Sequence, residues 1–275
     1  MLITSLMSLA LVAPPAAPAA AEQTHAVPRL VCESESLRAG TTANLGLTFR
    51  IEPHWHLYWN GQNDTGGTIR FTLTSPDGFV TEAAQWPAPS RQVLPGDTLN
   101  HIYEEEITLV IPVKVPPASA GTTARFTASL NWIACEEACV AEKASVELSL
   151  PVVAADAPAG PSVDSPLFDR ARRRLPKPLP LGSPGVELSL NASTGIARVP
   201  NASRLTLYPG PECSPIPFLL TEGDVKGEVL RVTLDSPEGV PARFQGILEV
   251  RAQGATSSTY YQVDVSGDKP GFNRK

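Results

Sequence analysis

The amino-acid sequence predicts an all-β protein with two β domains, and three observations support this prediction. Proline is abundant, at 28 of 275 residues, and no long segment has the periodicity of an amphipathic helix. Short stretches in which apolar and polar residues alternate recur along the chain, as expected of strands with one buried face. A segment rich in proline and alanine, residues 154–184, divides these stretches into two groups. We therefore expect domains at residues 22–153 and 185–265, joined by this linker.

The chain begins with a segment that has the features of a secretory signal peptide. Leu2–Val12 is apolar, and the alanine-rich stretch after it offers a cleavage site near Ala21, so that residues 1–21 would be removed. An uncleaved leader is the alternative, because no lysine or arginine precedes the apolar run. This run is shorter than the ~20 residues that a membrane-spanning helix needs. The sequence thus predicts an exported chain without stable membrane insertion.

The first group of alternating stretches predicts the strands of the N-terminal domain. In Thr42–Ile51, every second residue is apolar and these residues share one face. Further strands are expected at Trp55–Trp59, Ile69–Leu73, Ile107–Ile111, Arg125–Trp132 and Ala144–Val152. Turn-forming residues separate them, most clearly at residues 60–67, and Pro112 marks an edge or an end of a strand. About seven strands with turns between them are typical of a β-sandwich.

The second group predicts a smaller β domain. Its strands are expected at Val186–Leu190, Arg204–Tyr208, Val229–Leu234, Phe244–Val250 and Thr259–Val265. In the linker before it, Phe168–Leu175 contains four arginines. We interpret this piece as a solvated turn of helix, with a patch for a membrane or a partner as the alternative. Residues 266–275 are expected to form a polar tail.

Cys135 and Cys139 are the residues with the clearest chemical meaning. In an exported protein, two cysteines at this spacing close a small disulfide ring that is either a permanent staple or a redox couple. Because strand-like alternation flanks the pair on both sides, we expect the ring at a turn between neighbouring strands. A ring this small removes little entropy from the unfolded chain, which favours the redox role. The neighbouring Glu136 and Glu137 disfavour a thiolate and predict a slow, controlled donor.

Four motifs follow one another in the first domain. They are His54–Asn60 (HWHLYWN), Gln85–Pro89 (QWPAP), Ile102–Ile107 (IYEEEI) and Asn131–Cys139 (NWIACEEAC). In this order they resemble the W-H-x-Y-W, W-P-x-P, Y-G-Y-x-x-x-V and W-x-x-C-x-x-x-C elements of the N-terminal periplasmic domain of the DsbD family. This family comprises thiol:disulfide interchange proteins, including the suppressor-of-copper-sensitivity type. Ile102 stands where the family usually has glycine.

The resemblance implies an immunoglobulin-like sandwich that carries a reversible disulfide between Cys135 and Cys139. In the family, this domain takes electrons from a membrane-embedded domain and passes them to periplasmic thioredoxin-fold proteins. The resemblance thus implies a periplasmic thiol-disulfide oxidoreductase that needs no cofactor. Its electron donor would be a membrane-embedded protein of the DsbD or CcdA type on a separate chain. We expect Cys139 to attack the partner's disulfide and Cys135 to resolve the mixed disulfide.

The resemblance also implies a cap loop that covers the cysteines and opens for the partner. Residues 100–104 lie where this loop is expected, so that His101, Ile102, Tyr103 and Glu104 are the candidate cap. Tyr103 would shield the sulfur atoms, and His101 could contact them. An ordinary aromatic residue at a strand end is the alternative for Tyr103.

His54, His56 and Tyr58 are predicted to share one face of the strand at residues 55–59, because side chains alternate with a period of two. Together with Trp132, they are expected to support the active-site surface. Two such histidines beside two thiolates could bind copper or zinc, and a copper-handling protein is therefore one alternative function. The simpler interpretation is that these histidines face solvent or line the cap, with no metal bound.

Two further cysteines, Cys32 and Cys213, complete an even number in a chain that is expected to be exported. We expect Cys32, placed before the first strand, to form a structural disulfide with Cys213 in the second domain. Such a bridge would link the two domains. Two separate thiols are the alternative.

Several functions find no support in the sequence. The net charge of −6 argues against nucleic acid as a partner. No glycine-rich phosphate loop and no G-x-S-x-G motif occur, and four histidines leave little room for a hydrolase triad. The remaining rival is a binding module in which the disulfide between Cys135 and Cys139 is only a staple.

Overall fold

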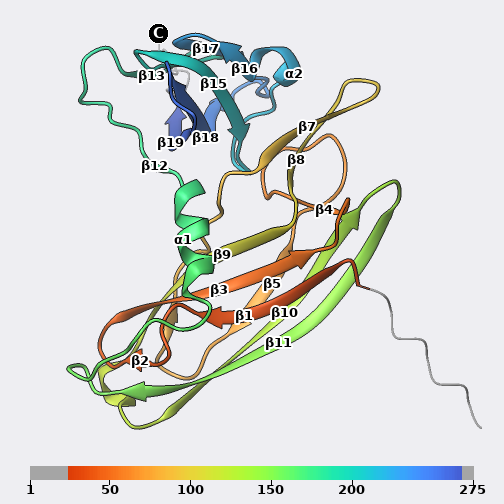
Figure 1. The fold of residues 1–275 in the computed structure, drawn as a ribbon. Coiled ribbons are helices and arrows are strands. Elements are labelled where there is room, and N and C mark those ends of the chain that lie inside the picture. Colours follow the sequence, from red (N-terminus) through yellow and green to blue (C-terminus); the bar gives the residue numbers. More distant parts are fainter. Residues whose placement is uncertain (1–23, 268–275) are drawn as a thin grey trace, which may run out of the picture.

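The computed structural model describes residues 24–267, and β-strands make up most of them (Figure 1). The all-β class predicted from the sequence is therefore confirmed. The expected signal peptide at residues 1–21 and most of the expected polar tail lie outside the described residues. Among the residues described, no helix is long and apolar enough to span a membrane.

The N-terminal part of the chain folds as a sandwich of two sheets, which we name the first sandwich. One sheet has the strand order β1-β3-β9-β6, and the other has the order β2-β11-β10-β4-β8-β7, with β5 beside β10. Its strands are β1 (Ala26–Cys32), β2 (Leu37–Arg38), β3 (Thr42–Ile51), β4 (His56–Tyr58), β5 (Arg70–Thr74), β6 (Val80–Thr81), β7 (Ser90–Leu94), β8 (Thr98–Tyr103), β9 (Glu106–Lys114), β10 (Thr123–Cys135) and β11 (Cys139–Val153). A short 3-10 helix at Pro117–Ser119 connects β9 to β10.

The core of the first sandwich lies between these two sheets. Phe49 from β3 and Phe126 from β10 are both fully buried there. The ring of Phe49 meets that of Trp132 edge-on, with 5.2 Å between the ring centroids. Burial of a side chain of this size stabilises the folded state by about 1.5–3 kcal/mol.

The longest strands, β10 and β11, form one continuous antiparallel hairpin. Their register runs from Thr123 opposite Pro151 to Cys135 opposite Cys139. The sequence predicted both strands, but it ended the first at Trp132 and began the second at Ala144. Both strands extend further towards the tip of the hairpin, where the alternation of apolar residues fades. The hairpin therefore carries its two cysteines at its end, as Figure 1 shows for the tips of β10 and β11.

A second β domain follows, also built from two sheets. One sheet has the order β12-β19-β18-β15-β16, and the other has the order β13-β14-β17. Its elements are β12 (Lys177–Pro178), β13 (Glu187–Asn191), β14 (Thr194–Arg198), β15 (Ala202–Pro209), α2 (Leu219–Glu222), β16 (Asp224–Lys226), β17 (Val229–Thr233), β18 (Arg243–Ala252) and β19 (Thr259–Ser266). Both sheets contribute to a core around the fully buried Phe244.

Helix α1 (Ser165–Arg174) lies in the segment that we expected to be a linker with a solvated turn of helix. Instead of being solvated, its apolar face is buried: Phe168 is fully enclosed and packs with Val31 of β1 and Val110 of β9. The helix thus covers the outer face of the sheet that contains these strands. The helix packs in this way because it is amphipathic. Its many arginines make the apolar face difficult to recognise in the sequence.

The arginines of α1 contact the chain itself. Arg170 forms an ion pair with Glu106, and Arg172 forms one with Glu33. Arg174 donates a hydrogen bond to the carbonyl oxygen of Pro89, at 2.7 Å. Most of the basic charge is therefore used within the molecule, which leaves little of it for a membrane or a partner.

Two further sequence predictions need correction. Cys32 does not precede the first strand but is the last residue of β1, a strand whose irregular composition hid it. Of the two alternatives for Pro112, an edge or an end of a strand, the end is wrong, because β9 continues to Lys114. Proline is tolerated here because the neighbouring strand β6 pairs only with the last two residues of β9.

Candidate functional site

The disulfide between Cys135 and Cys139 closes the turn of the long hairpin. The two Cα atoms are 4.2 Å apart, and the three residues between the cysteines form a tight turn in which Glu136 N donates to the carbonyl oxygen of Ala138. This is the arrangement predicted from the sequence. The two cysteines differ in exposure, since Cys135 is 2% exposed whereas Cys139 lies open to solvent. A partner can therefore approach the exposed residue Cys139, whereas Cys135 is covered.

The alternation of side chains in β10 places Cys135 on the outer face of its sheet. Trp132 and Ala134 point into the core of the first sandwich, and Ile133 and Cys135 point away from it. Two neighbouring strands add residues to the same outer face. Tyr58 from β4 and Ile102 from β8 join Ile133 and Cys135 in a small apolar cluster. The disulfide is thus supported by a patch that is separate from the main core.

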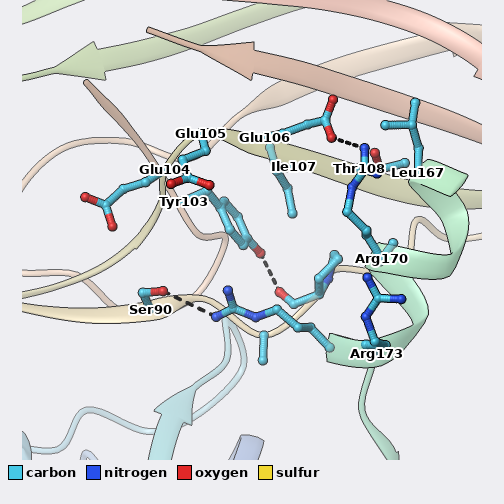
Figure 2. A pocket seen from close by; sticks show the side chains of 14 residues that line it. Ser90, Tyr103, Glu104, Glu105, Glu106, Ile107, Thr108, Leu167, Arg170 and Arg173 are labelled. Carbon is cyan, nitrogen blue, oxygen red and sulfur yellow. Dashed lines mark hydrogen bonds and ion pairs between the residues drawn. The ribbon is translucent and has the colours of Figure 1, made fainter. Parts of the chain in front are cut away.

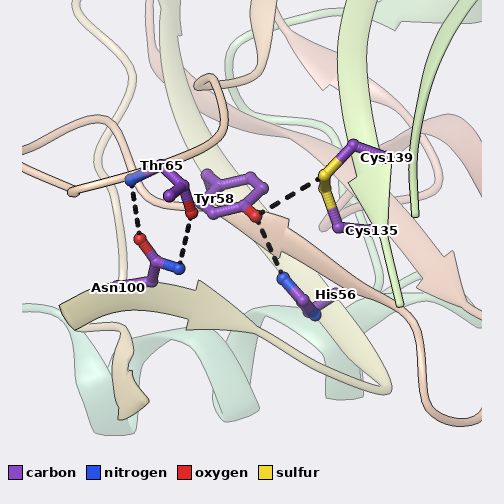
Figure 3. Close-up of a disulfide and its surroundings, with 6 residues drawn as sticks. All are labelled: His56, Tyr58, Thr65, Asn100, Cys135 and Cys139. Carbon is purple, nitrogen blue, oxygen red and sulfur yellow. Dashed lines mark hydrogen bonds between the residues drawn. A yellow bond between two sulfur atoms is a disulfide. The ribbon is translucent and has the colours of Figure 1, made fainter. Parts of the chain in front are cut away.

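Tyr58 is the aromatic residue beside the disulfide. Its hydroxyl oxygen lies 4.0 Å from Cys139 Sγ and 3.2 Å from His56 Nε2. Figure 3 shows the hydroxyl placed between the sulfur and the imidazole ring. Burial lowers the pKa of His56, and the negative charge of Glu104 offsets part of this effect. The neutral imidazole can therefore exchange a hydrogen bond with Tyr58 next to the sulfur.

A surface loop, residues 60–67, covers the ring of Tyr58. Gly66 has a φ of +75°, and a Cβ atom at this position would come within 2.1–2.4 Å of carbon atoms of the Tyr58 ring. Only glycine allows this approach. Next to it, the backbone N–H of Thr65 donates to Asn100 Oδ1, and Asn100 Nδ2 donates to Thr65 Oγ1 (Figure 3). The loop is therefore attached to β8 and lies directly on Tyr58.

The expected cap at residues 100–104 is wrong as a loop, because residues 98–103 form strand β8. Tyr103 does not reach the sulfur atoms. It is buried in the core, where its hydroxyl donates to the carbonyl oxygen of Pro87 at 2.6 Å, and burial raises its pKa well above the ordinary value. Ile102, which alternates with it, points to the disulfide instead. Glu104 follows the strand and is exposed.

His101 also lies on the opposite side of β8 from the disulfide. Its ring packs between Trp59 and Tyr208 of the second β domain, and its Nδ1 donates to the carbonyl oxygen of Gln62 at 2.7 Å. Burial lowers the pKa of His101 to about 4. This histidine therefore belongs to the contact between the two domains, and not to the surface around the cysteines.

Two other expected site residues lie elsewhere. Trp132 is 2% exposed and faces the core, where its Nε1 donates to Glu142 Oε2 at 2.7 Å. His54 precedes β4 and is exposed, with a φ of +75°, so that it does not share the face of His56 and Tyr58. Among residues 24–267, no group of three or more His, Cys, Asp and Glu side chains is placed to hold a metal ion.

The expected disulfide between Cys32 and Cys213 is absent, and both residues are buried free thiols. Cys32 packs in the core of the first sandwich, and Cys213 packs in the core of the second β domain. Two thiols in two separate cores cannot meet. Burial raises the pKa of both, that of Cys213 to about 11, so that neither forms a thiolate readily.

A cavity of about 480 Å³ lies apart from the disulfide, between α1 and the start of β9 (Figure 2). Glu104, Glu105 and Glu106 contribute acidic groups to its lining, and Arg170 and Arg173 contribute basic ones. Charges of both signs line the same cavity, and the pair between Arg170 and Glu106 crosses it. It has no contact with either cysteine.

Two comparisons with known proteins found similarity to this chain. Residues 27–151 match the family described as "Thiol:disulfide interchange protein DsbD, N-terminal". Among solved structures, the chain is similar to the N-terminal periplasmic domain of ScsB from Proteus mirabilis, with a TM-score of 0.53 and 17% identity, over 89% of this chain and 92% of that chain. It also aligns with the reduced N-terminal domain of DsbD from Neisseria meningitidis, with a TM-score of 0.30 and 11% identity, over 46% of this chain and 85% of that chain. No curated protein sequence matches the chain.

These similarities extend over different parts of the chain. The family match covers the sandwich that carries both cysteines of the disulfide. The likeness to the ScsB domain extends over both β domains, and at this identity it concerns the fold alone. The resemblance expected from the four sequence motifs is therefore confirmed for the first sandwich.

Proposed function

We propose that this chain, whose residues 27–151 form a DsbD N-terminal domain, relays reducing equivalents in the periplasm through a reversible disulfide between Cys135 and Cys139. The observation that carries the proposal is the unequal exposure of the two cysteine residues at the tip of the hairpin. A staple gains nothing from an exposed sulfur atom, whereas thiol-disulfide exchange requires one.

In the reduced protein, the exposed Cys139 acts as the nucleophile. Its thiolate attacks one sulfur of the partner's disulfide, a mixed disulfide forms, and the partner's other sulfur leaves as a thiolate that takes up a proton. The buried Cys135 then attacks Cys139 Sγ and releases the partner's second thiolate, which is also protonated. Two electrons and two protons pass to the partner, and the disulfide between Cys135 and Cys139 is restored.

Tyr58 and His56 support this exchange. The hydroxyl group of Tyr58 is 4.0 Å from Cys139 Sγ, and it can donate a hydrogen bond to the thiolate that forms on reduction. The imidazole of His56, neutral because burial lowers its pKa, can donate to the same hydroxyl oxygen and hold it in place. The pair thus stabilises the reactive form of the nucleophile without a cofactor.

The partners follow from the family and from the chemistry of exchange. The acceptors are exported proteins of the thioredoxin fold, which present an accessible disulfide. The electron donor is a membrane-embedded partner of the DsbD or CcdA type.

The reduction potential of the cysteine pair tests the proposal. The purified chain is equilibrated in glutathione buffers, and the trapped thiols are assigned by peptide mass spectrometry. A carrier should have a potential of about −180 to −270 mV, within reach of thioredoxin-fold proteins, whereas a structural staple stays oxidised to below about −300 mV. A value in the second range would reject the relay and favour a binding module.

Two serine variants assign the roles of the cysteines. Cys135→Ser should accumulate a mixed disulfide with a thioredoxin-fold acceptor, because Cys139 can attack but nothing resolves the product. Cys139→Ser should form no mixed disulfide, because the remaining thiol is buried. Normal turnover by either variant would contradict the proposal.

A further inference from the structure

The loop at residues 60–67 connects the second β domain to the disulfide. We propose that the second β domain positions Tyr58 beside Cys139 by holding this loop through Gln62. Gln62 is thus a positioning residue, which acts on the sulfur through the loop and Tyr58. This inference rests on the function proposed above and assigns a role in it to the second domain.

Gln62 uses its backbone and its side chain to bind the second domain. Its N–H donates to the carbonyl oxygen of Pro209 at 2.9 Å. Its Nε2 donates to the carbonyl oxygens of Cys213 and Ser214, at 2.9 and 3.2 Å. Its own carbonyl oxygen accepts from Nδ1 of His101, at 2.7 Å. The partners in the second domain are backbone atoms, which makes this a contact of defined geometry.

The contact is close along the backbone as well. A Cβ atom at Gly61 would lie 2.2 Å from the carbonyl oxygen of Pro209 and 2.2 Å from the indole ring of Trp59. Only a glycine lets the loop pass between these groups. The loop therefore rests against the end of β15, without space for a side chain at this position.

The remaining residues of the loop carry this constraint to β8 and to Tyr58. Asn63 Oδ1 accepts from the N–H of His101 at 2.7 Å, and Asp64 Oδ2 accepts from the N–H of Leu99 at 2.6 Å. Thr65 exchanges two hydrogen bonds with Asn100, and the next residue, Gly66, touches the Tyr58 ring. Each loop residue from Gln62 to Gly66 thus has a hydrogen bond or a close contact, and the last of these contacts is with Tyr58.

These contacts hold the loop against the ring of Tyr58, whose hydroxyl lies towards Cys139 (Figure 3). If the second domain releases Gln62, the loop keeps its bonds to β8 but loses its outer support. The Tyr58 hydroxyl then donates less often to the thiolate of Cys139, and this thiolate forms at higher pH. The second domain thus affects the pH at which the Cys139 thiolate forms, without contacting Cys139.

The test is the pH dependence of alkylation of Cys139 in the reduced, full chain. Iodoacetamide is the probe, and peptide mass spectrometry reports the modification of Cys139 alone. Tyr58→Phe should move the midpoint of the pH–rate profile upwards by roughly one pH unit, a tenfold loss of thiolate, which is the effect of one hydrogen bond to a charged group. Gln62→Glu, which replaces the amide donor by a carboxylate facing two carbonyl oxygens, should move it in the same direction by a smaller amount.

Three comparisons make the test specific for positioning. In the Tyr58→Phe background, Gln62→Glu should cause no further shift, because the two residues act in series. Gln62→Lys, which can again donate to the two carbonyl oxygens, should return the midpoint towards that of the unsubstituted protein. Arg91→Ala removes another contact with the second domain, a 2.6 Å hydrogen bond to the carbonyl oxygen of Leu220, and should leave the midpoint unchanged.

Either of two results would overturn the inference: an unchanged profile in Gln62→Glu, or an equal shift in Arg91→Ala. A shift by Gln62→Glu that persists in the Tyr58→Phe background would also overturn it. The assay needs no redox partner, so it is independent of the relay function. A reduction potential in the range of a staple would reject the relay, and the alkylation profile would still decide whether Gln62 positions Tyr58.

Discussion

The first sandwich and the second β domain have similar architectures but differ in where they place their cysteines. Each consists of two sheets around a core, and each core contains one buried thiol, Cys32 or Cys213. In the first sandwich, the hairpin of β10 and β11 carries two more cysteines, Cys135 and Cys139, at its tip. The difference shows that the position of a cysteine, in a core or at a hairpin tip, decides whether the fold suppresses or presents its reactivity.

The largest expected effect is on the reactivity of the thiols. In the reduced, folded protein, iodoacetamide should modify Cys139 about ten-thousand-fold faster than Cys32 or Cys213, because a core thiol reacts only after an opening that costs about 5.5 kcal/mol. Mass spectrometry of the labelled peptides gives the three rates. In denaturant, the rates should become similar. Comparable labelling of Cys213 in the folded protein would remove the contrast between the two domains.

The second prediction separates the stabilities of the two domains. Phe244→Ala removes a fully buried ring from the second core and should lower the free energy of unfolding of that domain by about 3–5 kcal/mol. All four tryptophans lie between residues 55 and 132. Trp59 also contacts Tyr208 of the second domain, so tryptophan fluorescence reports mainly the first sandwich, and circular dichroism reports both domains. The dichroism transition should move to lower denaturant. The matched variant Phe126→Ala should instead shift the fluorescence transition.

The third prediction concerns pH and the contact between the domains. Burial lowers the pKa of His101 to about 4, against about 6.5 for an unfolded histidine. Between these values the unfolded chain binds a proton that the folded protein does not, so the free energy of unfolding falls as the pH falls through this window. Over the whole window, protonation of His101 in the unfolded chain lowers the free energy of unfolding by about 3 kcal/mol, as follows from the size of its pKa shift.

Urea unfolding at about pH 7 and about pH 4.5 measures this effect. His101→Gln keeps a donor for the carbonyl oxygen of Gln62 but does not titrate, so its loss of stability over this interval should be smaller than that of the unsubstituted protein. An equal loss in both proteins would show that His101 is not the group responsible.

The smallest effect is expected at a buried carboxylate near the tip of the hairpin that carries the two cysteines. Glu142 accepts hydrogen bonds from Trp132 Nε1 at 2.7 Å and from the N–H of His25 at 2.6 Å. Glu142→Ala leaves both donors unpaired and should lower the free energy of unfolding by about 1–3 kcal/mol. The control is Glu147→Ala on the same strand, whose exposed ion pair with Arg125 should contribute at most about 1 kcal/mol. Equal losses in chemical denaturation would contradict this difference.

Much of the fold could be predicted because the strands of the two cores follow a period of two. Strand β3 was predicted with its observed ends, Thr42 and Ile51. Strand β8 was missed, since its buried positions include the polar residues Asn100 and His101, which are fully enclosed. Their hydrogen bonds come from the loop at residues 60–67, and a partner so far along the chain leaves no signal in the local pattern.

The candidate site was predicted in part for the same reason. Cys135 and Cys139 were placed at a turn, and His56 and Tyr58 were placed on one face, because both statements depend on local spacing. Which aromatic residue meets the sulfur was predicted wrongly. Tyr103 was expected to shield the sulfur atoms, but in β8 its side chain points into the core. Tyr58 from β4 lies beside Cys139 Sγ instead.

The sequence by itself therefore determined the all-β class, the disulfide at a turn and the resemblance of the first sandwich to the DsbD N-terminal domain. These features depend on residue spacing over a few positions, which is written in the chain. The tertiary structure alone decided which cysteine is exposed, that Cys32 and Cys213 lie in separate cores, and that the second domain reaches Tyr58 through Gln62. These depend on strand pairing and register between segments far apart, where a shift of one residue turns every side chain to the other face.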